Sequence, residues 1–115
     1  MFDFEKLEVY QKAKYFNVQV FEFLQSENLK DRVIKDQLRR ASLSIMLNIA
    51  EGCSRFSKAD RRHFFVISRG SVFECVAVID FLKTISSMDI IQYNNFYKLS
   101  EELSKILFSL IQNLK

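Results

Sequence analysis

The stretch from Ile34 to Gly52, IKDQLRRASLSIMLNIAEG, decides the fold of this 115-residue chain. Six of its residues recur at steps of four, three, four, three and four, namely Ile34, Leu38, Ala41, Ile45, Asn48 and Gly52. Residues at this spacing share one face of an α-helix, as they do in the seam of a coiled coil. The seam ends on a polar side chain and then on a glycine. The stretch therefore predicts a long helix whose C-terminal end is a joint with a neighbouring helix.

The same helical period governs the remainder of the chain. Four helices are expected, at about residues 3–26, 31–53, 57–86 and 94–114. The chain has no proline and only two glycines, fewer turn residues than sheets and hairpins usually need. Long helices joined by short links pack as antiparallel neighbours. The sequence therefore predicts an all-α, up-down-up-down four-helix bundle that forms a single domain over residues 1–115.

The first expected helix is apolar over much of its circumference. One stripe contains Phe4, Leu7, Tyr10, Lys14, Val18, Phe21 and Leu24, and a second contains Val9, Phe16, Val20 and Phe23. A helix of this kind is either deeply buried or faces a second partner. The chain also has twelve phenylalanines and four tyrosines, more aromatic residues than the inside of one slender bundle needs. Exposed aromatic stripes, and through them an oligomer interface, are therefore expected.

Polar residues mark the expected ends of the helices. A turn is expected over residues 26–31, with Asp31 as the N-cap of the second helix. Ser57 is the expected N-cap of the third helix, and Asp60 follows three residues later, as in a capping box. Residues 86–95, SSMDIIQYNN, read as the link between the third and fourth helices.

Small and polar residues are expected to fit the second and third helices together. Gly70 and Ser71 let two backbones approach closely. A buried polar network is predicted to fix the register of the two helices, and its members are Asn48, Glu51, Arg69, Ser71 and Glu74. Glu51 also precedes Arg55 by four residues, the favourable orientation for a helical ion pair.

The carboxylates offer an enzymatic alternative, in which Glu51 and Glu74 act as an acid–base pair or bind a metal. A di-iron bundle needs two Glu-x-x-His repeats, whereas this chain has one histidine, His63, three residues after Asp60. Cys53 and His63 have no partner pair at zinc-ligand spacing. The chain has no P-loop, no glycine-rich phosphate cradle and no Ser/His/Asp order. We therefore expect no enzyme, no metal and no cofactor.

Positive charge is concentrated in the middle of the chain. Residues 30–69 contain ten Lys or Arg and four Asp or Glu, a balance of +6, and the remainder sums to −3. Six cations are the predicted nucleic-acid contacts, namely Arg39, Arg40, Arg55, Lys58, Arg61 and Arg62. The start of the third helix disfavours cations through its dipole, but its free N–H groups favour phosphates. Two simpler readings stay open: mixed charge on solvated faces, or neutralisation by a neighbouring subunit or by Glu101 and Glu102.

The chain has no feature of an exported or membrane protein. No apolar run approaches the roughly 20 residues that span a bilayer. The acidic start MFDFEKLEVYQ does not fit a signal peptide. Cys53 and Cys75 are too few for a disulfide framework. A cytoplasmic protein without membrane contact is therefore expected.

The motif QLRRASLSIMLNIAEG, followed by a basic linker and SRGSVFE, resembles the signature of a known family. These are four-helix-bundle proteins encoded in intervening sequences of bacterial 23S ribosomal RNA, which read Q-L-R-R-A-x-x-S-I-P-x-N-I-A-E-G and then A-R-G-S-x-x-E. The opening FEKLEVYQKA is also similar, so the resemblance covers nearly the whole chain. Met46 stands where proline is usual and Ser68 where alanine is usual. The second helix should therefore be straighter here.

The resemblance implies a left-handed bundle that assembles as a ring-like homopentamer, with no established enzymatic activity. One relative, the accessory protein of diversity-generating retroelements, is a basic pentamer that partners a reverse transcriptase and nucleic acid. With the basic middle of the chain, this favours a non-enzymatic oligomer that binds nucleic acid, most simply RNA, through phosphates. The alternative is a scaffold oligomer whose basic face meets an acidic protein partner such as a reverse transcriptase, with no direct nucleic-acid role.

Overall fold

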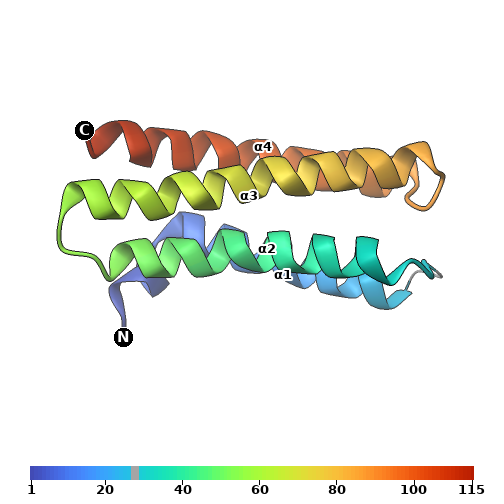
Figure 1. The fold of residues 1–115 in the computed structure, drawn as a ribbon, viewed down its shortest axis with the longest axis horizontal. Helices are drawn as coiled ribbons and strands as arrows, with labels where there is room; N and C mark the ends of the chain where they lie inside the picture. Colours follow the sequence, from blue (N-terminus) through green and yellow to red (C-terminus); the bar gives the residue numbers. More distant parts are fainter. Residues whose placement is uncertain (27–28) are drawn as a thin grey trace.

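The computed structural model describes residues 1–26 and 29–115 and confirms the all-α four-helix prediction. A short 3-10 turn, η1 (Asp3–Lys6), precedes four helices: α1 (Glu8–Ser26), α2 (Arg32–Cys53), α3 (Lys58–Thr84) and α4 (Ile90–Asn113). Consecutive helices run in opposite directions, and both chain ends lie at the same end of the bundle (Figure 1). The left-handed twist stays a prediction. No helix in the described ranges combines the length and apolarity that crossing a bilayer requires.

The pairing of α2 with α3 is the most extensive helix contact in the described chain. The predicted seam residues Leu38, Ala41 and Ile45 are all buried. From α3, the fully buried Ser68 donates a hydrogen bond to the Ile45 carbonyl oxygen at 2.7 Å. Cys75 is also fully buried on α3. Small side chains at this contact leave room for the two helices to approach closely, as the sequence predicts.

The two glycines have different surroundings, and the close backbone approach predicted at Gly70 is instead found at Gly52. A methyl group added at Gly52 would lie 2.8 Å from Phe65 Cε1. A methyl group added at Gly70 would meet no atom within 4 Å, because Gly70 faces outward from α3. The tight contact that requires a glycine is therefore at the end of α2.

An aromatic cluster joins α1 to α4. The ring of Phe96 lies edge-on to Phe16 and Phe23, with centroid distances of 5.8 and 6.0 Å. All three side chains are almost completely buried. Edge-to-face aromatic pairs contribute about 0.5–1.5 kcal/mol beyond the burial of their area. This cluster packs the first helix against the last.

The two apolar strips predicted for the first helix have different surroundings. Val18 and Phe21 are 46% and 56% exposed, whereas the second strip supplies the core. The helix predicted over residues 3–26 is also interrupted at Leu7, whose extended backbone separates η1 from α1. Phe4 and Leu7 are therefore not part of α1. The residues of α1 that enter the core are Val9, Ala13, Phe16, Val20, Phe23 and Leu24.

Two predicted N-caps are confirmed. The Asp31 carboxylate accepts a hydrogen bond from the Ile34 backbone N–H at 3.1 Å. The Ser57 hydroxyl accepts one from the Asp60 N–H at 3.1 Å. Both bonds satisfy an N–H group that has no partner inside the helix. Residues 27 and 28, in the predicted turn before Asp31, lie outside the described residues.

Helix α4 begins earlier than predicted, inside the stretch read as a link. Asp89 is its N-cap and accepts a hydrogen bond from the Gln92 N–H at 2.7 Å. The Gln92 side chain accepts one from the Asp89 N–H at 3.2 Å, which completes a capping box. Asp-x-x-Gln is the sequence signal for this start.

The turn after α3 contains a strained serine. Ser86 has a φ of 60°, the only positive value outside glycine in the described residues. Its N–H donates to the Lys83 carbonyl oxygen at 3.0 Å, and the Ser87 N–H donates to Leu82 at 2.9 Å. A left-handed residue that closes a helix is the position where glycine is preferred.

We expect Ser86→Gly to raise the free energy of unfolding by about 0.5–1 kcal/mol, because glycine adopts this φ without a Cβ clash. Urea denaturation followed by circular dichroism measures the change. Ser87→Gly is the matched control and should lower stability, because it adds chain entropy without relieving a positive φ. Equal changes in the two variants would contradict the prediction.

Candidate nucleic-acid interface

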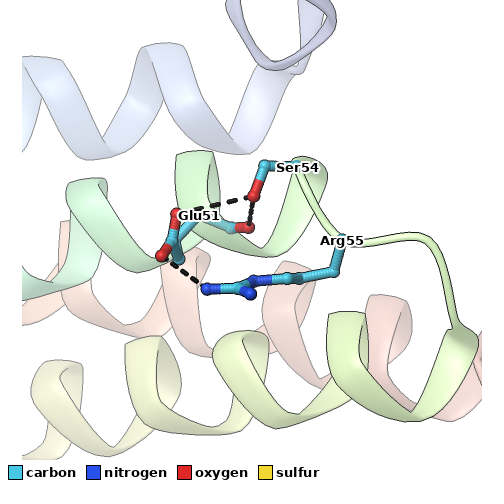
Figure 2. Close-up of polar contacts among 3 residues, drawn as sticks. All are labelled: Glu51, Ser54 and Arg55. Carbon is cyan, nitrogen blue, oxygen red and sulfur yellow. Dashed lines mark hydrogen bonds and ion pairs between the residues drawn. The ribbon is translucent and has the colours of Figure 1, made fainter.

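A small polar cluster forms where α2 ends, and Figure 2 shows its three residues. Ser54, the C-cap of α2, donates from its hydroxyl to the Glu51 carbonyl oxygen at 2.7 Å. The Nη2 atom of Arg55 lies 2.7 Å from Glu51 Oε1, which confirms the predicted ion pair. Because both side chains are partly exposed, the pair contributes at most about 1 kcal/mol.

Arg55 is held from a second side by an aromatic ring. Its guanidinium carbon lies 4.6 Å from the centre of the Phe64 ring on α3. Its Nε atom is buried and has no hydrogen-bond partner among the described residues. The cation is therefore fixed at the joint of α2 and α3, and its charge is largely balanced by Glu51.

Arg61 and Arg62 bind backbone carbonyl groups. Arg61 Nε donates to the Arg55 carbonyl oxygen at 2.7 Å. Arg62 Nη1 donates to the Leu114 carbonyl oxygen at 2.6 Å. The second bond places a cation at the C-terminal end of α4, where the helix dipole favours positive charge. These two arginines thereby tie the start of α3 to the α2–α3 link and to the end of α4.

The acidic residues of α4 do not neutralise these cations, contrary to one of the simpler readings of the sequence. Glu102 pairs with Lys12 on α1 at 3.3 Å. Glu101 is exposed and lies beside the groove between α3 and α4. A carbonyl oxygen is neutral, so Arg61 and Arg62 keep their net charge.

The other predicted contact residues lie on exposed surfaces. Lys58 is the first residue of α3, and neither it nor Arg40 has a partner among the described residues. Arg39 lies 3.8 Å from Asp36, a loose pair on the surface of α2. Arg39 and Arg40 lie 13 to 14 residues before the end of α2 at Cys53, which is roughly 20 Å at 1.5 Å per residue. The six predicted cations therefore form two separate groups.

The polar link between α2 and α3 has a different composition from the predicted network. The Asn48 amide donates to the Ser44 carbonyl oxygen at 2.9 Å and to the Ser44 hydroxyl at 3.0 Å. The Ser71 hydroxyl donates to the Ser44 hydroxyl at 2.7 Å. Ser44, which the prediction left out of the network, is therefore the residue that joins Asn48 to Ser71.

The three charged members of the predicted network bind other residues. Glu51 binds Arg55, and Glu74 accepts a hydrogen bond from Gln37. Arg69 Nε donates to the Ser104 carbonyl oxygen on α4 at 3.2 Å. The five residues therefore do not form one network, although the bond from Gln37 on α2 to Glu74 on α3 also links these two helices.

The structure does not bring Glu51 and Glu74 together as the acid–base pair of the enzymatic alternative. Glu74 is bonded to Gln37 on α2, and Gln37 precedes Glu51 by 14 residues, or roughly 20 Å along that helix. No three His, Cys, Asp or Glu side chains gather as metal ligands in the described parts of the chain. Burial raises the pKa of the Cys75 thiol to about 12, and burial also raises the pKa of Cys53. Protonated thiols are weak nucleophiles at neutral pH.

Comparison with known proteins identifies the family. The sequence model of the 23S rRNA-intervening sequence protein family matches residues 5–109. Among solved structures, the chain is similar to a protein of unknown function from the S23 ribosomal protein family of Bacteroides thetaiotaomicron, with 27% identity and a TM-score of 0.83. That match covers 90% of this chain and 97% of the other. No curated protein matches the sequence. The chain belongs to the 23S rRNA-intervening sequence protein family.

Proposed function

We propose that this protein is a non-enzymatic, cytoplasmic helical bundle that binds RNA through its phosphate groups. The observation that carries the proposal is a set of cations with no carboxylate partner in the described chain, within a segment whose charge balance is +6. Its members are Arg40, Lys58, Arg61 and Arg62. Cations that are not already paired attract a polyanion most strongly, because each phosphate contact releases a counterion.

Three of these cations, at the start of α3, remain able to bind phosphate groups. Arg61 uses its Nε in the bond to Arg55, and Arg62 uses one terminal nitrogen in the bond to Leu114. Each guanidinium has five N–H donors, so both retain donors for a phosphate. Lys58 stands at the start of α3, where free backbone N–H groups also favour anions. Arg39 and Arg55 are weaker contacts in this scheme, because each already has a carboxylate partner.

Self-association is part of the proposal. Val18 and Phe21 on α1 and Val66 on α3 are all between 46% and 56% exposed. Apolar surface of this kind is usually covered by a partner. We expect light scattering to give several times the chain mass of 13.6 kDa, with the homopentamer as the expected ring. A mass of one chain at micromolar concentration would contradict this part.

A scaffold that binds an acidic protein is the second candidate. It is favoured by the ion pair between Glu51 and Arg55, which reduces the charge available to RNA at the joint. A pull-down experiment distinguishes RNA binding from the scaffold function. A protein partner that stays bound after nuclease treatment would support the scaffold function.

The RNA-binding proposal is tested by charge reversal. We expect Arg40→Glu with Lys58→Glu to weaken binding to structured RNA about tenfold or more, because two phosphate contacts are lost. Neither side chain has an internal partner, and an acidic residue in the first turn of a helix is favourable, so the fold should persist. Lys6→Glu with Lys98→Glu makes the same change in net charge elsewhere on the exposed surface. Equal affinities of the two double variants would contradict the assignment.

A further inference from the structure

A groove of about 290 Å³ lies between α3 and α4. Phe73 and Val76 line it from α3, and Tyr97, Ser104 and Lys105 line it from α4. Phe73 and Tyr97 are 57% and 41% exposed, so aromatic surface in the groove is open to solvent. Apolar walls with a few polar groups are typical of small-ligand sites.

Arg69 lies beside this groove and contacts two of the residues that line it, Phe73 and Ser104. Its Nε donates to the Ser104 carbonyl oxygen at 3.2 Å. Its guanidinium carbon lies 4.9 Å from the centre of the Phe73 ring and 5.3 Å from that of Phe108. No carboxylate lies within ion-pair distance of Arg69 in the described chain, so its charge is not balanced. Its terminal nitrogens retain donors for an anion.

We propose that this groove binds an unpaired nucleotide of single-stranded RNA. The base stacks on the exposed face of Phe73, and the terminal nitrogens of Arg69 bind the adjacent phosphate. Aromatic rings beside a cation are the common means of binding single-stranded nucleic acids, because every base has a face that stacks. Arginine is suited to the phosphate, since its planar group donates two parallel hydrogen bonds. The inference rests on the RNA binding proposed above and specifies which RNA structure is bound.

The charges around the groove favour this occupant over a second copy of the chain. Glu101 and Lys105 lie one helical turn apart on the α4 wall and balance each other, so Arg69 supplies the net positive charge. An apolar helix packed here would remove the Arg69 guanidinium from water without a carboxylate partner, which costs free energy. A nucleotide brings its own negative charge to Arg69.

The absence of tryptophan from the chain allows a direct test. Phe73→Trp introduces a single tryptophan at the groove, and Phe81→Trp is the matched control. Phe81 is 49% exposed on the same helix but lines the groove between α2 and α3. A short unstructured RNA should quench the fluorescence of the Phe73→Trp protein by stacking and leave that of the Phe81→Trp protein unchanged. Equal quenching, or none, in both would overturn the inference.

Affinity measurements separate this inference from the proposed function. We expect Phe73→Ala to weaken binding of the unstructured RNA about 5- to 150-fold and to leave binding of a fully paired duplex unchanged. Phe81→Ala should change neither. If the wild type binds RNA and Phe73→Ala has no effect, the stacking site is wrong and the proposed function stands. If Phe73→Ala lowers the assembly mass and not the RNA affinity, the groove is a contact between copies. Failure of the wild type to bind either RNA at low salt would overturn both.

Discussion

Replacing Phe96 with alanine is expected to lower the free energy of unfolding by about 3–5 kcal/mol. Phe96 is 3% exposed, and its ring meets Phe16 and Phe23 edge-on, so alanine removes both aromatic contacts and leaves a cavity between α1 and α4. The backbone of α1 and α4 pairs less extensively than that of α2 and α3, so few other contacts compensate. Urea denaturation followed by circular dichroism at 222 nm, the usual helix wavelength, measures the loss.

The matched control for this prediction is Phe81→Ala on α3. Phe81 is 49% exposed, so the same truncation removes less buried surface and should cost about 1 kcal/mol or less. Because a small domain has a total stability of about 5–15 kcal/mol, the Phe96 variant should unfold at a much lower urea concentration. Similar midpoints for the two variants would contradict the packing described for the aromatic cluster.

The second large effect is expected at Gly52, where a methyl group should cost about 1–3 kcal/mol. The added Cβ would lie 2.8 Å from Phe65 Cε1, 3.1 Å from Phe65 Cδ1 and 3.3 Å from the Arg61 carbonyl oxygen. Phe65 is 5% exposed, so its ring has little room to move, and the carbonyl belongs to the backbone of α3. Alanine favours the helix by up to about 1 kcal/mol over glycine, which offsets only part of the loss.

Gly70→Ala makes the same chemical change with the opposite expected sign. No atom lies within 4 Å of the added Cβ, and the residue is inside α3 with a negative φ. Alanine should therefore raise the free energy of unfolding by about 0.5–1 kcal/mol through helix propensity and reduced chain entropy. The difference between the two urea midpoints is the measurement. Equal losses at both glycines would contradict the close contact at Gly52.

The fold was predictable from the sequence wherever a pattern stayed within one helix. The 4-3-4-3-4 spacing from Ile34 to Gly52 identified the buried face of α2, and Asp31 and Ser57 identified two helix starts. The prediction did not choose which of the two apolar strips of α1 enters the core, and it did not anticipate the extended backbone at Leu7. It also missed the start of α4, although Asp89 and Gln92 carry the capping-box signal.

The candidate site was predictable only where its contacts are local in sequence. The Glu51–Arg55 pair follows from their four-residue spacing on a helix. The bond from Arg62 to Leu114 spans 52 residues, and that from Arg69 to Ser104 spans 35. Such contacts depend on how α3 packs against α4, which no spacing along one helix determines. Ser44 was within reach of prediction, because it lies one turn before Asn48 on the same helix.

The salt dependence of RNA binding tests the central claim most directly. Fluorescence anisotropy with a structured RNA gives the affinity at about 50 and about 200 mM salt. If Arg40, Lys58, Arg61 and Arg62 each neutralise one phosphate, affinity should fall about 100-fold over this range. Negligible binding at both concentrations, or binding that does not change with salt, would contradict the claim that this bundle binds RNA through its unpaired cations.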